Sequence, residues 1–205
     1  LAQDKSVRSI AEVLASGVRE QIDSITGLAS IPSRYISTGL IALDALIRGW
    51  RFGGMYLVTA PSSTGKSLFV QDRAIDLAVR GYRVLLFTTE MADDDVVSRQ
   101  IFMMAGLDEL DARARADAYI DGQMLTNAMD QASELPLYYK DSGDLSVERM
   151  EATVHQEMHR IKPDIIIIDH FHEMRSEKKF NRQDEMLEYM AHRIKAIARR
   201  YDIPV

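Results

Sequence analysis

The sequence predicts an α/β fold, a mostly parallel sheet flanked by helices. Short apolar runs alternate with longer amphipathic segments along most of the chain. The runs show little polar alternation, which is typical of strands covered on both faces. A length of 205 residues, with 46% hydrophobic and 27% charged residues, suits one globular core with an appendage. The net charge of −6 weighs against a wholly basic nucleic-acid module, and the lack of cysteine excludes disulfides and thiolate metal sites.

The appendage is predicted to be a linker helix followed by a connecting loop. Apolar residues recur every three or four positions from Val7 to Ile22, which gives the helix one apolar face. Gly27 and Pro32 mark a turn-rich stretch before the main body begins near Tyr35. We therefore divide the chain into a linker, residues 1–34, and a core, residues 35–205. An ordinary first helix that covers its own domain is the alternative.

The core is predicted to alternate strands with helices. The expected strands are the apolar runs Met55–Ala60, Val84–Thr88, Pro136–Lys140 and Ile165–Ile168, with the opening of a fifth at Ile203–Val205. The helices expected between them cover residues 67–80, 93–133 with breaks at Gly106 and Gly122, 147–160 and 184–201. No apolar run approaches the ~20 residues that a membrane helix needs, so we expect no membrane partner.

The turn after the first expected strand has the composition of a polyphosphate-binding loop. It reads Ala60, Pro61, Ser62, Ser63, Thr64, Gly65, Lys66 and Ser67. Between a strand and a helix, its backbone N–H groups would surround a di- or triphosphate. Lys66 would reach the β- and γ-phosphates, and the Ser67 hydroxyl would bind Mg²⁺. A Gly-Lys pair followed by Ser or Thr arises by chance in roughly a tenth of chains this long, so the interpretation needs further residues.

Two acids that follow expected strands supply that support. Asp169 comes directly after Ile165–Ile168, and Glu90 follows Val84–Thr88. Carboxyl ends of parallel strands form the edge where ligands bind in open α/β folds. Asp169 is therefore predicted to hold Mg²⁺ through water, and Glu90 to activate the attacking water. The alternative for Asp169 is an acid that only ends a strand, whereas Asp93–Asp95 are interpreted as first-turn acids of the next helix.

These residues together resemble the motor domain of DnaB-type replicative helicases, a branch of the RecA-type ATPases. The resemblance covers residues 35–205 and rests on Ser37-Thr38-Gly39 with Leu43 and Leu46, the loop at 60–67 with its Ala60, Thr89-Glu90-Met91 with Arg99, Asp169, and Asn181-Arg182-Gln183 with Glu185. It implies a RecA-like P-loop core in which residues 60–67 and Arg99 bind ATP. In that core Ser67 and Asp169 would hold Mg²⁺, and Glu90 and Lys66 would be catalytic.

The same resemblance implies an ATP-dependent, ring-forming DNA helicase that translocates on single-stranded DNA. Its partners would be identical subunits in a hexamer and a primase or helicase loader. Its location would be the cytoplasm of a bacterial or phage-infected cell, with a mitochondrial location left open. Relatives continue past the position of Val205 with a sensor, a second DNA loop and an arginine finger, so we expect weak or no unwinding by these residues alone. A RecA-like recombinase or signalling ATPase that assembles without unwinding, and a partner protein that uses nucleotide only to assemble, are the alternatives.

A basic loop follows the strand that carries Asp169. Residues 174–184 contain four cations, Arg175, Lys178, Lys179 and Arg182. In a RecA-type ring this loop would face the channel, where its cations would contact DNA phosphates. A solvated loop is the alternative. His170 and His172 depart from the Tyr and Gln common in bacterial members, and the sequence leaves their roles open.

Overall fold

The computed structural model describes residues 9–13, 34–61, 63–109, 119–141 and 143–205. The chain divides into two compact units, Leu1–Ile36 and Ser37–Val205. In the first unit the described elements are α1 (Ile10–Val13) and β1 (Tyr35–Ile36). The rest of the expected linker helix lies outside the described residues. Of the helices described, none has the length and apolar character needed to cross a membrane.

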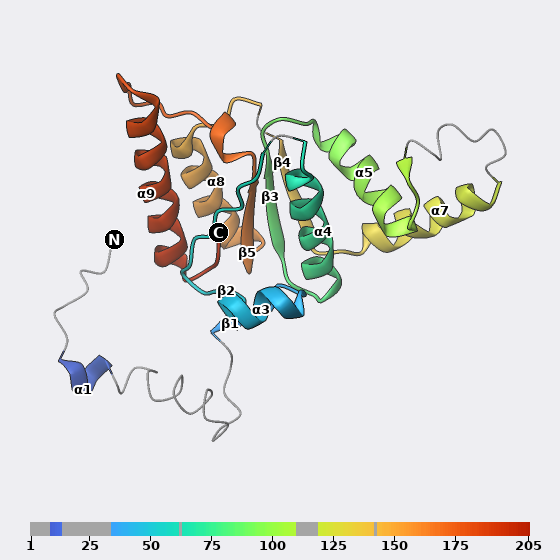
Figure 1. Cartoon of the computed structure of the whole chain (residues 1–205), viewed down its shortest axis with the longest axis horizontal. Helices are drawn as coiled ribbons and strands as arrows, with labels where there is room; N and C mark the ends of the chain where they lie inside the picture. The colour runs from blue at the N-terminus through green and yellow to red at the C-terminus, as the bar shows by residue number, and fades with distance from the viewer. Residues whose placement is uncertain (1–8, 14–33, 62, 110–118, 142) are drawn as a thin grey trace. The chain divides into compact units, whose positions relative to one another are not determined.

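A three-stranded parallel sheet forms the centre of the second unit (Figure 1). Its order is β4 (Leu137–Asp141), β3 (Val84–Thr88) and β5 (Ile165–Asp169). Thr88 at the end of β3 is paired with Asp141 on one side and Asp169 on the other. The three strands therefore end level with one another, and the residues that follow them emerge at one edge.

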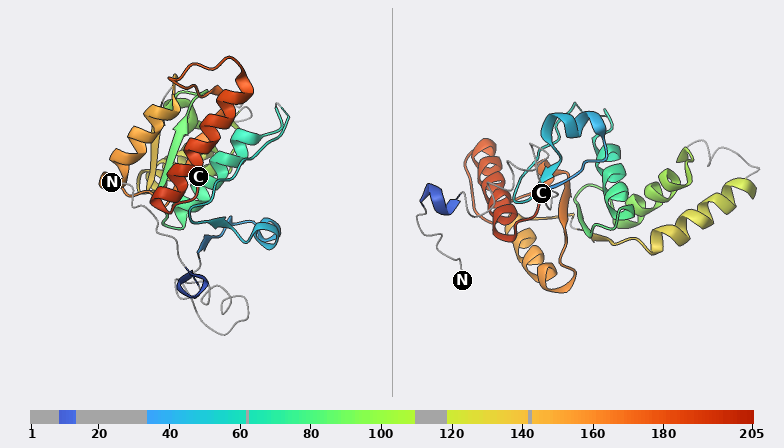
Figure 2. Two further views of the ribbon diagram at one scale, coloured as in Figure 1. Left: turned by 90° about the vertical axis from the view of Figure 1, so that its left-hand side faces the viewer. Right: turned by 90° about the horizontal axis from the view of Figure 1, so that it is seen from below.

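Helices cover both faces of this sheet (Figures 1 and 2). α8 (Val147–Arg160) and α9 (Gln183–Tyr201) lie on one side, and α4 (Lys66–Val79) lies on the other with α5 (Asp93–Ala105) beside it. Leu85 and Phe87 of β3 pack into a core with residues of α8 and α9. Because side chains alternate along a strand, Val84 and Leu86 face the side of α4. Burial on both faces explains why β3 is apolar from Val84 to Phe87.

In the described part of the core, the predicted helices agree closely with the observed ones except at one glycine. Gly106 ends α5 in the left-handed conformation, with φ 68°, as expected for a helix C-cap. Gly122, however, lies inside α7 (Tyr119–Ser133), so the predicted break there is wrong. A glycine inside a helix costs only about 1 kcal/mol, which the packing of α7 against α5 offsets. α3 (Ile41–Ile47), β2 (Trp50–Arg51) and the 3₁₀ turn η2 (Phe171–Glu173) complete the described elements of this unit.

The strand predicted at Met55–Ala60 is also wrong. These residues adopt neither helix nor strand, and Ile203–Val205 is not a strand either. The Tyr56 N–H donates to the Val205 carbonyl (2.8 Å), and the Ile166 N–H donates to the Pro204 carbonyl (3.1 Å). The segment ending at Val205 thus lies between residues 54–56 and β5. A strand needs a hydrogen-bonded neighbour along its length, and the described residues offer Met55–Ala60 one only near Tyr56.

Candidate functional site

The loop at residues 60–67 leads directly into the N-terminus of α4. Gly65 caps the helix with φ 89°, a left-handed conformation that strains any residue with a Cβ atom. α4 begins with no side-chain cap and no acid in its first turn. Its first N–H groups are therefore available to an anion. Ser62 lies outside the described residues.

Lys66 turns back over this loop. Its amine donates hydrogen bonds to the carbonyl oxygens of Ala60 (2.8 Å) and Pro61 (2.9 Å), and the Thr64 hydroxyl donates to Pro61 (2.7 Å). Ala60 and Lys66 line a cavity of about 400 Å³ together with Asp169. The predicted phosphate-binding lysine and the predicted Mg²⁺-binding acid therefore border the same space.

Ser67 and Asp169 come together across the site, although 102 residues separate them in the chain. The Ser67 hydroxyl donates to Asp169 Oδ1 over 3.2 Å. Asp169 is the last residue of β5, and its side chain is only 11% exposed. A hydroxyl and a carboxylate are hard oxygen ligands of the kind that Mg²⁺ takes. This donor set, beside an uncapped helix N-terminus, fits a magnesium-bound polyphosphate.

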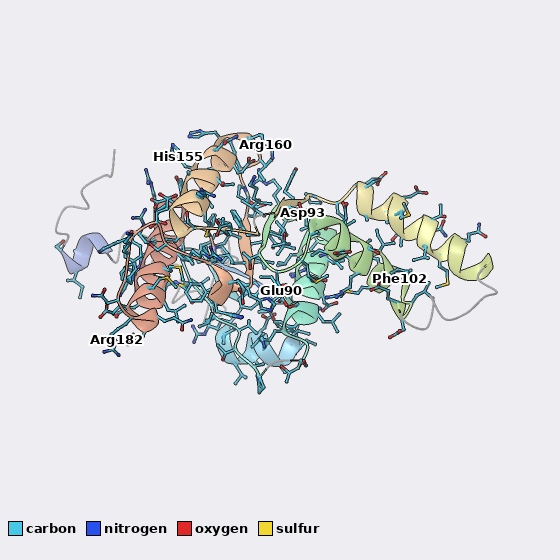
Figure 3. All side chains as sticks on the ribbon, turned by 90° about the horizontal axis from the view of Figure 1, so that it is seen from above. Glu90, Asp93, Phe102, His155, Arg160 and Arg182 are labelled. Atoms are coloured by element: carbon cyan, nitrogen blue, oxygen red, sulfur yellow. The ribbon has the colours of Figure 1, made fainter. Side chains whose placement is uncertain are left out.

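His170 connects this pair to Glu90. Its Nε2 lies 3.1 Å from Ser67 Oγ and 3.3 Å from Asp169 Oδ1. Its Nδ1 lies 2.6 Å from Glu90 Oε2, although the ring is not aligned with that oxygen for a hydrogen bond. Glu90 comes two residues after β3, and Figure 3, a view from above, shows it near the middle of the unit. Ser67, Glu90 and Asp169 thus meet at one edge of the sheet, as predicted, around a histidine whose role the sequence left open.

Thr89 ties the ends of β3 and β5 together. Its N–H donates to the Asp169 carbonyl (2.8 Å), and its hydroxyl accepts from the His170 N–H (2.8 Å). The next acid, Asp93, accepts a hydrogen bond from the Thr88 hydroxyl (2.8 Å) and lies in the first turn of α5, as predicted for Asp93–Asp95.

Arg99 lies further along α5 and is not among the described residues that line the cavity. Its contact with nucleotide stays a prediction.

In the basic loop, Arg182 lies away from Glu90, near the start of α9 (Figure 3). Arg175 pairs with Asp144 (3.1 Å), and Arg182 pairs with Asp184 (2.7 Å). The Lys178 amine lies 5.3 Å from the ring centres of Phe180 and Tyr189. Lys179 is exposed and has no such partner among the described residues. The structure therefore brings none of the four to the cluster around His170, and their contact with DNA stays a prediction.

Glu148, in the first turn of α8, holds the basic loop in place. Its carboxylate accepts hydrogen bonds from the Ser176 hydroxyl and the Glu177 N–H, both at 3.0 Å. Burial alone would raise the pKa of Glu148, but the hydrogen bonds from Glu177 and Ser176 outweigh it and the pKa is lowered. The carboxylate thus stays ionised and fixes the start of the loop. The role of Glu148 is not predictable from the sequence, because nothing in its local pattern distinguishes it from an ordinary first-turn acid.

Comparison with known proteins gives consistent matches. The profile of the family described as DnaB-like helicase C terminal domain matches residues 35–205. The replicative DNA helicase DnaB of Geobacillus stearothermophilus is 27% identical over 173 residues, 83% of this chain and 38% of that protein. The probable replicative DNA helicase of Guillardia theta is 23% identical over 203 residues, 98% of this chain and 33% of that protein. The chain thus spans little more than a third of the length of these relatives.

Two solved structures share the fold. One is described as an ATPase domain and superimposes with a TM-score of 0.82 at 23% identity, covering 98% of this chain and 70% of that one. The other, a DnaB-like replicative helicase solved in a study of its interactions with primase, gives 0.79 at 23% identity, covering 99% of this chain and 48% of that one. These similarities confirm the predicted RecA-like α/β fold.

Proposed function

This chain belongs to the DnaB-like helicase C-terminal domain family, and on that premise we propose that it is the ATP-hydrolysing motor of a replicative DNA helicase. The observation that carries the proposal is that three segments place four side chains around one sheet edge. Lys66 and Ser67 are the first two residues of α4, Glu90 follows β3, and Asp169 ends β5. This is the set of groups that phosphoryl transfer from ATP to water requires.

The loop and its two oxygen ligands would hold Mg·ATP. The N–H groups at the start of α4 and the Lys66 amine would bind the phosphates, Lys66 exchanging the carbonyls of Ala60 and Pro61 for phosphate oxygens. Ser67 would bind Mg²⁺ directly, and Asp169 would bind it through water. The ion would neutralise charge on the β- and γ-phosphates. The low exposure of Asp169 and its hydrogen bond from Ser67 support this assignment.

Glu90 would act as the general base. Its side chain is 62% exposed at the sheet edge, so water can reach the carboxylate. The carboxylate would accept a proton from the water that attacks the γ-phosphorus, while the bond to the β–γ bridging oxygen breaks. ADP and inorganic phosphate are the products.

Single-stranded DNA is the proposed track, and identical subunits in a ring are the proposed assembly. The basic loop at residues 174–184 offers cations to DNA phosphates although the net charge of the chain is −6. Primase is a proposed partner, by similarity to the DnaB-like replicative helicase whose structure was solved in a study of its interactions with primase. A helicase loader is a second proposed partner.

Strand separation tests the proposal against its main rival. The longest protein that contains these 205 residues is incubated with ATP, Mg²⁺ and a labelled forked duplex, and ATP hydrolysis is measured with and without single-stranded DNA. We expect hydrolysis that rises with DNA, together with release of the labelled strand, and loss of both in Asp169→Asn. Hydrolysis and assembly without strand release would instead support a RecA-like recombinase or signalling ATPase.

A further inference from the structure

We propose that His170 is a positioning residue that holds Glu90 in place relative to the Ser67–Asp169 pair. The inference rests on the proposed function, since it assigns His170 a part in water activation by Glu90. It goes beyond that function, which assigns roles to the phosphate-binding loop and the two acids but none to His170. His170 acts through Glu90, without contacting the reacting atoms itself.

The two nitrogens of one imidazole ring serve both halves of the site. Nδ1 lies 2.6 Å from Glu90 Oε2, while Nε2 lies 3.1 Å from Ser67 Oγ and 3.3 Å from Asp169 Oδ1. The ring is only 16% exposed, so its position is limited by its surroundings. Among the buried polar atoms described, Nδ1 is one that lacks an aligned hydrogen bond. A small rotation of either side chain would align Nδ1 and Glu90 Oε2 for a hydrogen bond.

Glu90 needs such a partner because little else restrains it. Its side chain is 62% exposed, and among the described residues His170 is the only side chain paired with it. An unrestrained glutamate samples several rotamers in solvent. A general base must lie within hydrogen-bonding reach of the water that it activates, and a shift of about 1 Å in a reacting group can cost roughly 100-fold in rate.

The backbone fixes His170 relative to Glu90. The His170 N–H donates to the Thr89 hydroxyl (2.8 Å), and the Thr89 N–H donates to the Asp169 carbonyl (2.8 Å). Thr89 directly precedes Glu90, so hydrogen bonds join the segments that follow β3 and β5 next to both side chains. With the backbone held in this way, the rigid imidazole ring of His170 reaches from Glu90 to Asp169.

Kinetics of matched variants test the inference. In His170→Ala we expect kcat for ATP hydrolysis to fall roughly 10- to 100-fold, while the KM for ATP and the affinity for a fluorescent ADP analogue stay within about threefold. His170→Gln, whose amide can still contact both partners, should recover part of the lost kcat. His192→Ala, an exposed histidine on α9, is the control and should match the wild-type protein. A wild-type kcat in His170→Ala, or a loss of nucleotide affinity as large as the loss of kcat, would overturn the inference.

A spectroscopic readout tests the contact without activity. In ¹⁵N NMR spectra of the imidazole rings, Glu90→Gln should shift the His170 Nδ1 signal and leave the His192 signals in place. An unmoved Nδ1 signal would refute the contact. The proposed function fails separately, if Glu90→Gln hydrolyses ATP like the wild-type protein, whereas the inference alone fails if Glu90→Gln is inactive and His170→Ala is not.

Discussion

Lys178 and Lys179 are neighbours in the chain with different surroundings. The Lys178 amine packs over Phe180 and Tyr189, whose ring centres lie 5.2 Å apart. Such a cation–π contact keeps a lysine close to its own domain. Lys179 is exposed and has no partner among the described residues, so its amine is free to meet a phosphate. The two lysines are therefore not equivalent candidates for DNA contact.

We predict that Lys179→Ala lowers the salt dependence of single-strand binding by about 0.7 in the slope of log K against log salt, the value for one phosphate contact. Lys178→Ala should change this slope less, since its amine is already engaged. The measurement is the affinity for a labelled oligonucleotide between roughly 50 and 200 mM salt. An unchanged slope in the Lys178→Ala/Lys179→Ala double variant would remove both lysines from the DNA contacts.

At this scale the sequence predicts the loop and the two acids but not their neighbours. Glu90 and Asp169 are predictable because each comes at or just after the end of an apolar run that forms a strand of the sheet. Lys66 is predictable because it stands in a Gly-Lys-Ser sequence just before a helix. The part played by His170 depends on which way its ring turns after β5, and no periodicity encodes that direction. The link from Glu148 to the loop depends on folding across more than twenty residues, which sequence spacing does not show.

Gly106 and Gly122 occupy different positions relative to their helices. Gly106 has φ 68° and caps α5, whereas Gly122 lies inside α7 without a positive φ. In both cases an added Cβ would meet no atom within 4 Å. Both positions therefore have room for a Cβ atom, and they differ only in backbone conformation.

We predict opposite effects of alanine at these two positions. Gly122→Ala should raise the free energy of unfolding by roughly 0.5–1 kcal/mol, because alanine has the higher helix propensity. Gly106→Ala should lower it by about 1 kcal/mol, because alanine is strained in the left-handed region. Urea unfolding of both variants beside the wild-type protein is the measurement. Changes of the same sign would contradict the observed helix boundaries.

Arg83 and Asp164 join the beginnings of β3 and β5. The backbone N–H and Nε of Arg83 donate to Asp164 Oδ2 (2.9 and 3.0 Å), and its Nη2 donates to Oδ1 (2.8 Å). Burial would raise the pKa of Asp164, but the hydrogen bonds from Arg83 outweigh it and the pKa is lowered. The folded state therefore favours the ionised carboxyl group.

We predict that Asp164→Asn lowers the free energy of unfolding by about 1 kcal/mol at pH 7, after allowance for the partial exposure of the pair. Since the folded pKa is the lower one, the contribution is complete above the unfolded pKa of about 3.9 and disappears as the pH falls through the folded pKa. Urea unfolding at several pH values measures the gap between variant and wild type. A gap that widens as the pH falls below about 4 would contradict the assignment.

At the scale of elements, sequence patterns predict helices and the fully paired strands best. α4, α8 and α9 lie where amphipathic segments predict helices, and β3 lies where a continuous apolar run predicts a strand. Met55–Ala60 fails because a strand is defined by its partners, and an apolar run does not say whether a neighbour is present. Gly122 fails because helix packing outweighs a local preference.

At the scale of the whole unit, strand order and register assemble the site. β3 lies between β4 and β5, and Thr88 pairs with Asp169, so Glu90 and His170 emerge from neighbouring strands at the same level. Alternating strands and helices predict a parallel sheet, but they do not fix which strands adjoin. The order β4–β3–β5 therefore came from the structure, while the common edge could be expected from the sequence.

The central claim is that one pocket at this edge hydrolyses ATP with Glu90 as the base. The most direct measurement is steady-state ATP turnover of Glu90→Gln beside its affinity for a fluorescent ADP analogue. We predict that turnover falls at least about 100-fold while the affinity changes less than about threefold, because glutamine keeps the shape of the side chain and loses its basicity. Turnover equal to that of the wild-type protein would contradict the claim.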